Sequence, residues 1–187
     1  LTVRKTIPAT PVISGPTDPC PFIGNGTAVY TINRVLGATS YTWTVPAVGA
    51  TAVHPFPDGV DDTVIIVTYT SDFVNGNITA RANAFCANSS TRSLSIIRKL
   101  PSTPGLISTT VISAACPVRR YSYAINSLPA NATGTFWTVP TGAVIDSGQG
   151  TLRIYVTYTP NAVAGEFVTV RGTNGCAAST TPRKLTI

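Results

Sequence analysis

The sequence has 187 residues, 43% of them hydrophobic and only 11% charged, which suits a globular chain with a sizeable core and excludes a disordered one. The net charge of +6 comes from basic residues that occur singly or in pairs, never in long runs, so no nucleic-acid partner is expected. No apolar run approaches the roughly 20 residues of a membrane helix, and membrane insertion is not expected.

Short segments rich in Val, Ile, Thr and Tyr lie between turn residues along the whole chain, and no stretch has a helical period. This pattern predicts an all-β fold. Six or seven strands in about 90 residues is the size of an immunoglobulin-like antiparallel β-sandwich. The strands expected in the first half are 10–14, 27–35, 40–46, 63–70, 77–85 and 92–98.

The second half of the chain repeats the first half. Trp43-Thr44-Val45-Pro46 recurs as Trp137-Thr138-Val139-Pro140, and the opening residues match a strand that closes the first copy. We therefore predict two tandem sandwiches cut from a longer array, joined by short proline-containing segments that hold neighbours in a semi-rigid arrangement. The predicted parts are 1–7 as the end of a preceding repeat, 8–100 as the first module and 101–187 as the second module.

Comparison of the two copies assigns the faces of the strands. Positions that are apolar in both copies are expected in the core, and these include Tyr69, which matches Tyr158. Trp43 and Trp137 also recur at one position and are expected in the core. Val64 and Ile66 match Arg153 and Tyr155, so they are expected on the outer face, as a small contact patch specific to the first module. The expected core residues are Trp43, Trp137, Tyr69 and Tyr158.

Four cysteines allow three pairings, and the repeat favours one bond in each module, Cys20 with Cys86 and Cys116 with Cys176. Disulfides persist in oxidising surroundings, so this pairing predicts an extracellular or periplasmic protein.

Few residues are suited to catalysis or metal binding. His54 is the only histidine and Glu166 the only glutamate, so no enzyme active site is expected. Asp58, Asp61 and Asp62 form the one acidic cluster; they are a candidate Ca²⁺ site, with a plain polar turn as the favoured alternative and no cofactor expected.

A cysteine-proline pair, the Trp-Thr-Val-Pro strand, the turn Ser147-Gly148-Gln149-Gly150-Thr151 and a closing cysteine resemble the PKD-like, immunoglobulin-like modules of large secreted bacterial proteins, especially those using type IX secretion. The resemblance covers nearly the whole chain, twice. It implies a secreted or cell-surface location and a role as a spacer, stalk or adhesin, and it transfers no catalytic residues.

The favoured function is therefore a non-catalytic structural repeat of an extracellular fibre, stalk or adhesin, whose partners are neighbouring repeats of the same or an identical chain. The rival is an accessory module, part of a secreted enzyme, that binds a polysaccharide or a surface protein through loops that differ between the copies. The candidate binding residues are His54, Phe56, Val64, Ile66, Arg119 and Arg120, with the last two expected in a turn.

Overall fold

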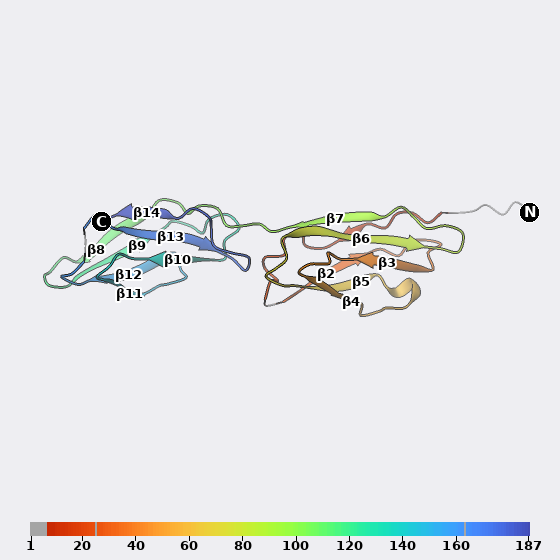
Figure 1. The fold of residues 1–187 in the computed structure, drawn as a ribbon, viewed down its shortest axis with the longest axis horizontal. Coiled ribbons are helices and arrows are strands. Elements are labelled where there is room, and N and C mark those ends of the chain that lie inside the picture. The colour runs from red at the N-terminus through yellow and green to blue at the C-terminus, as the bar shows by residue number, and fades with distance from the viewer. Residues whose placement is uncertain (1–6, 25, 163) are drawn as a thin grey trace, which may run out of the picture. The chain divides into compact units, whose positions relative to one another are not determined.

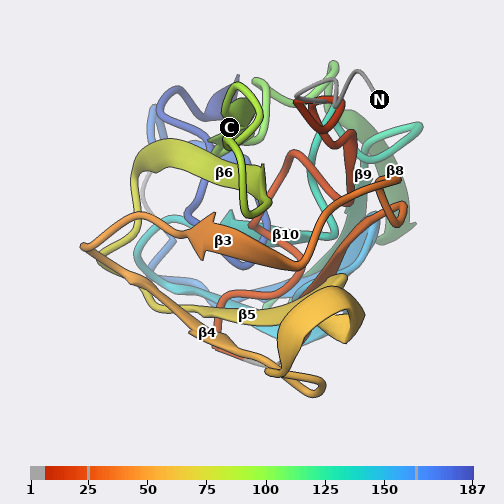
Figure 2. The ribbon, with the colours of Figure 1, turned by 90° about the vertical axis from the view of Figure 1, so that its right-hand side faces the viewer.

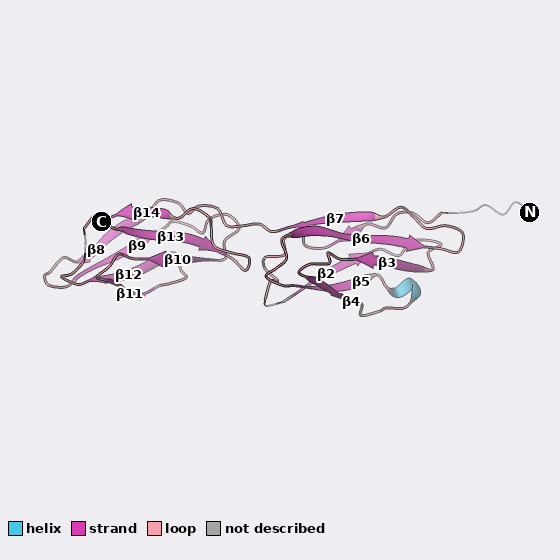
Figure 3. Ribbon diagram, viewed as in Figure 1, coloured by secondary structure: helices cyan, strands magenta, loops and turns pink. Residues whose placement is uncertain are grey.

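The computed structural model describes residues 7–24, 26–162 and 164–187. The chain forms two compact units, Leu1–Lys99 and Leu100–Ile187, which we call the first and the second module. Residues 1–6, most of the segment expected to end a preceding repeat, lie outside the described residues. Each module is built from antiparallel strands in two sheets, and the only helical element described is a short 3-10 turn, so the all-β prediction is confirmed (Figures 1 and 3).

In the first module, a four-stranded sheet with the order β1-β2-β5-β4 faces a three-stranded sheet with the order β3-β6-β7. Figure 2 shows β3 and β6 in one layer and β4 and β5 in the other. The elements are β1 (Ile13–Ser14), β2 (Thr27–Ile32), β3 (Ser40–Thr44), β4 (Ala50–Val53), the 3-10 turn η1 (Gly59–Asp61), β5 (Val64–Tyr69), β6 (Asn75–Asn83) and β7 (Arg92–Ile97).

The second module repeats this arrangement, with one sheet in the order β11-β12-β9-β8 and the other in the order β10-β13-β14. Strands β4 and β11 were not expected from the sequence; each is a short edge strand that pairs with only one neighbour. The elements are β8 (Ser108–Ser113), β9 (Arg119–Ala124), β10 (Gly134–Thr138), β11 (Ala143–Ser147), β12 (Arg153–Tyr158), β13 (Phe167–Thr173) and β14 (Arg183–Thr186).

The core of each module lies between its two sheets and is formed by alternate residues of the central strands. Along β5 and β12 every second side chain is buried, because successive side chains of a strand point to opposite faces. Ile65, Val67 and Tyr69 face the core in the first module, as Ile154, Val156 and Tyr158 do in the second.

The two modules also share the polar contacts of their cores. The hydroxyls of Tyr30 and Tyr69 lie 2.8 Å apart, as do those of Tyr123 and Tyr158. The indole nitrogen of Trp43 donates to the Asp62 carbonyl at 3.0 Å, and that of Trp137 donates to the Thr151 carbonyl at 2.9 Å. Each buried polar group of this set has a partner, and an unpaired buried group costs about 1–3 kcal/mol.

The prediction of one disulfide per module is wrong. Cys86 and Cys116 are exposed free thiols, whereas Cys20 and Cys176 are disulfide-bonded, so neither Cys20–Cys86 nor Cys116–Cys176 is formed. The core tryptophans therefore pack within their modules without an intramodule disulfide against them. The spacing of the cysteines fits more than one pairing, and only their tertiary positions decide between them.

Candidate functional site

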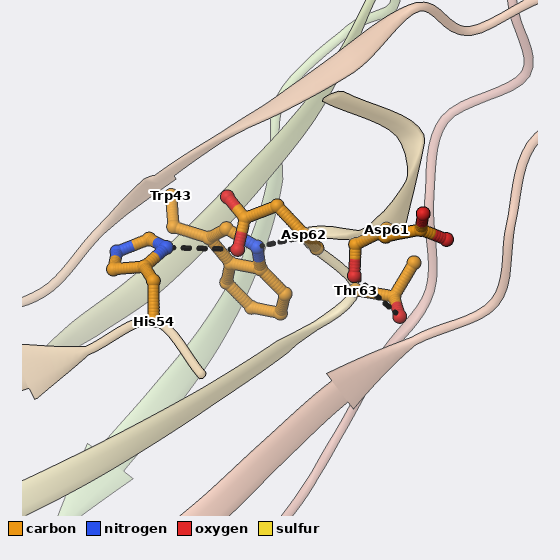
Figure 4. Close-up of polar contacts among 5 residues, drawn as sticks. All are labelled: Trp43, His54, Asp61, Asp62 and Thr63. Atoms are coloured by element: carbon orange, nitrogen blue, oxygen red, sulfur yellow. Dashed lines mark hydrogen bonds and ion pairs between the residues drawn. The ribbon is translucent and has the colours of Figure 1, made fainter. Parts of the chain in front are cut away.

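The loop that follows β4 in the first module contains the candidate binding residues His54 and Phe56 and the three aspartates of the candidate Ca²⁺ site (Figure 4). His54 Nδ1 lies 2.8 Å from Asp62 Oδ1, and the Asp62 side chain is buried. The Asp62 carbonyl accepts the Trp43 indole hydrogen and so ties the loop to the core, while the Asp62 side chain joins the end of the loop to its start at His54. The contacts of His54 and Asp62 hold the loop in place.

The three acidic residues of this loop do not converge on one point. Asp61 forms an ion pair with Arg34, while Asp62 contacts His54, and Figure 4 shows the two carboxylates pointing to opposite sides. Nowhere in the described residues do three or more His, Cys, Asp or Glu side chains gather as a metal site would need.

Phe56 is exposed at the tip of the same loop. Together with Pro55, Pro57, Asp58 and Asp61 it lines a shallow depression of about 310 Å³. The two prolines restrict the backbone on either side of Phe56. An exposed aromatic ring is suited to contact with another surface, and the 3-10 turn of this loop has no counterpart among the described elements of the second module.

Val64 and Ile66 lie on the outer face of β5, where both are half-buried. Val29 of β2 and Val53 of β4 stand directly opposite Ile66 and are more exposed. The outer face of this sheet therefore has a continuous apolar patch across three strands. At the same positions of the second module, Tyr155 lies opposite Ser122 and Ser147, so the patch is specific to the first module.

Arg119 and Arg120 do not lie in a turn as the sequence suggested. Both belong to β9, and because neighbouring residues in a strand point to opposite faces, their side chains lie on opposite sides of the sheet. Arg120 is paired with Asp146 at 3.2 Å. Arg119 instead lines a pocket of about 340 Å³ in the second module.

This tyrosine pocket, as we call it, is walled by the rings of Tyr121, Tyr123 and Tyr158, with Ala162 and Leu185 beside them. The rings of Tyr121 and Tyr158 meet edge to face, with centroids 5.5 Å apart. Burial raises the pKa of both Tyr123 and Tyr158, so both hydroxyls keep their hydrogens at neutral pH. The pocket therefore presents aromatic faces, hydroxyl donors and one cation.

Sequence reasoning missed this pocket, although the repeat contained the signal. Phe73 of the first module is fully buried and packs edge-on against Tyr69 at 4.8 Å, and its repeat counterpart is Ala162. The two residues occupy the same turn, since the amide of each bonds the carbonyl three residues before it. Replacing this ring with a methyl group leaves space in the second module that the first module fills.

The geometry defines a class of protein: tandem β-sandwich modules with a shared framework. Within that class the chain belongs to the PKD-like domain family, which matches residues 6–96 and again residues 100–187. No curated protein sequence matches the chain.

Several solved structures are similar in fold over most of the chain. Domains 5–6 of the S-layer protein SbsC share 12% identity, with 94% of this chain and 98% of that chain covered and a TM-score of 0.31. The adhesin InvE of Yersinia pseudotuberculosis shares 15% identity, with coverages of 95% and 58% and a TM-score of 0.27. The N-terminal periplasmic domain of ScsB from Proteus mirabilis shares 13% identity, with coverages of 86% and 86% and a TM-score of 0.26. At these scores nothing about function follows from the likeness.

No helix in the described part of the chain is long and apolar enough to cross a membrane.

Proposed function

We propose that the chain is a non-catalytic structural repeat of an extracellular fibre, stalk or adhesin, and that its first partners are neighbouring modules. The observation that carries this proposal is the duplication of the whole framework. Both modules have a hydrogen-bonded pair of buried tyrosines and a tryptophan whose indole nitrogen donates to a backbone carbonyl. A repeated framework is what an array needs, because each module contributes its own stability.

The state of the cysteines supports the same function. Cys20 and Cys116 occupy one repeat position, and Cys86 and Cys176 occupy another. At each position one copy is in a disulfide and the other is an exposed free thiol. This is the pattern of an array in which the first kind of cysteine bonds the second kind in the following module. In such an array Cys86 bonds a cysteine of a preceding module, and Cys116 bonds a cysteine of a following module.

Oxidation of the 187-residue chain tests this linkage. With oxidised glutathione as the oxidant, the Cys116 thiolate attacks the small disulfide and releases one reduced glutathione. The Cys86 thiolate of a second chain then attacks the Cys116 sulfur and releases the other glutathione, so two thiols become one disulfide. We expect a ladder of oligomers on non-reducing gels that dithiothreitol collapses.

Two single variants act as matched controls for each other. Cys86→Ser and Cys116→Ser should each fail to form a ladder alone, whereas a mixture of the two should form a dimer whose linked peptide contains Cys116 and Cys86. Mass spectrometry showing Cys20 bonded to Cys86 in one chain would contradict the proposal, and so would links only between identical cysteines.

The surface location is tested separately, with antibodies raised against the chain. We expect them to label intact cells of the source organism or material released from those cells. Labelling that appears only after the cells are broken open would refute an extracellular structural role.

A second candidate function is binding of a polysaccharide or a surface protein. The tyrosine pocket favours it, because Ala162 lines the pocket where the first module has the buried ring of Phe73, and a binding site, unlike a framework, need not be repeated.

A further inference from the structure

The tyrosine pocket has a hydrogen-bond donor that the protein itself does not use. In the first module the two core tyrosines form a complete chain, because Tyr30 donates to the Pro16 carbonyl at 2.9 Å and Tyr69 can donate to Tyr30. In the second module the Tyr123 and Tyr158 hydroxyls bond only each other, at 2.8 Å. One of their two hydrogens has no acceptor among the described residues, although both side chains are 2% exposed.

Three differences between the copies meet at this pocket. Ala162 replaces Phe73, which removes a ring from the loop after β12. Tyr121 stands where the first module has Ala28, as the pairing of β9 with β12 and of β2 with β5 shows, and it adds a ring to the pocket wall. By the same register, Arg119 stands where the first module has Gly26. The aromatic ring therefore comes from the loop in the first module and from the strand in the second module, which also has a cation beside it.

The charged side chains of the pocket wall are of one sign. Among its lining side chains Arg119 is charged and none is acidic. The nearby acids have other partners, since Asp146 is paired with Arg120 and Glu166 accepts a hydrogen bond from the Thr141 amide at 2.7 Å. A guanidinium with no described salt-bridge partner beside a pocket favours an anionic ligand, and its fork of donors fits a carboxylate.

We propose that the tyrosine pocket binds a carboxylated sugar unit, such as a uronic acid residue of an anionic polysaccharide. Arg119 bonds the carboxylate, the spare tyrosine hydrogen is donated to a ring or hydroxyl oxygen, and the Tyr121 ring packs against the apolar face of the sugar. The cavity is of the size that small-molecule sites occupy. This proposal rests on the binding role named above as the second candidate function.

The test is a titration of the 15N-labelled 187-residue chain with glucuronate and galacturonate, followed by amide chemical shifts. We expect saturable shifts in β9, in β12 and around Ala162, and much weaker ones with glucose and galactose. Benzoate separates the two features of the ligand, because it carries a carboxylate on a flat ring without hydroxyls. Equal binding of benzoate and glucuronate would overturn the assignment to a sugar.

Three variants complete the experiment. Ala162→Phe fills the pocket as the first module does and should lower the affinity at least about tenfold. Arg119→Gln should weaken uronate binding to the level of the neutral sugars. The control is Arg120→Gln, which removes the same charge from the same strand but on the opposite face, and should leave binding within about twofold.

The failures of the two proposals are distinguishable. If neither uronate shifts any pocket resonance, or if Ala162→Phe binds as the wild type does, the ligand proposal is refuted. The structural role then stands or falls on the antibody and oxidation experiments, which do not involve this pocket.

Discussion

Phe73 is the residue whose removal should most clearly separate the two modules. Its side chain is 0% exposed, its ring meets Tyr69 at 4.8 Å, and its backbone packs against Gly49, where a Cβ atom would lie 2.2 Å from the Phe73 nitrogen. The turn is therefore closely packed and has little freedom to collapse into a cavity. Truncating a phenylalanine that is buried in such a site to alanine costs about 3–5 kcal/mol of stability, so we expect Phe73→Ala to destabilise the first module by that amount.

The measurement is urea unfolding followed by tryptophan fluorescence. Trp43 is the only tryptophan of the first module, so a Trp137→Phe background restricts the signal to that module. The matched control is Phe85→Ala in the same background, since Phe85 is 96% exposed and its loss should change stability by no more than about 0.5 kcal/mol.

A second substitution tests the reason for the effect. The second module tolerates Ala162 at the position of Phe73 because Tyr121 supplies a ring from the neighbouring strand. Ala28→Tyr alone should overpack the first module and cost about 1–3 kcal/mol, whereas in the Phe73→Ala background it should recover part of the loss. If Ala28→Tyr costs the same in both backgrounds, or if Phe73→Ala costs less than about 1 kcal/mol, the reasoning is refuted.

Two further predictions concern the core pair and a turn. Burial raises the pKa of Tyr30 and Tyr69, so their contribution to stability is present below the unfolded pKa near 10 and is lost as the pH rises beyond it. The loss is up to about 1.4 kcal/mol per pH unit for each group. Changing both tyrosines to phenylalanine should reduce this alkaline slope in pH-dependent urea unfolding, and an unchanged slope would contradict the assignment. Gly148→Ala should destabilise the second module more than Gly150→Ala. Both glycines have φ near +90°, but only at Gly148 would a Cβ atom lie 2.1 Å from the Arg153 carbonyl oxygen. Equal melting temperatures for the two variants would show that the Arg153 carbonyl moves away from the added Cβ.

The sequence was sufficient to predict the fold and the inner faces of the strands, because burial repeats in both copies. A position such as Ile65, apolar in both modules, must face the core, whereas Val64 matches Arg153 and cannot do so. Short edge strands such as β4 were missed because a few residues that pair on one side only carry too little alternation to be recognised.

Comparison of the two copies does not predict the pairing of the cysteines. Comparing the copies establishes that Cys20 and Cys116 are equivalent, but it does not reveal whether the partner of each lies in the same copy or in another. Both alternatives give each kind of cysteine one partner of the other kind, so spacing alone does not distinguish them. The choice depends on tertiary position, which the sequence pattern does not encode.

The same comparison supports the proposed binding role when it is made on differences instead of similarities. Random drift between two copies of a framework is expected to scatter exchanges over the surface, each within its own surroundings. Here the exchanges of Phe73 for Ala162, Ala28 for Tyr121 and Gly26 for Arg119 all fall on one pocket, and they act together: one opens space, one lines it with a ring and one adds a charge. An exchange of packing, with the ring of Tyr121 in place of that of Phe73, explains the first two changes but not the added charge of Arg119. The added charge is therefore the change that the proposed anionic ligand is needed to explain.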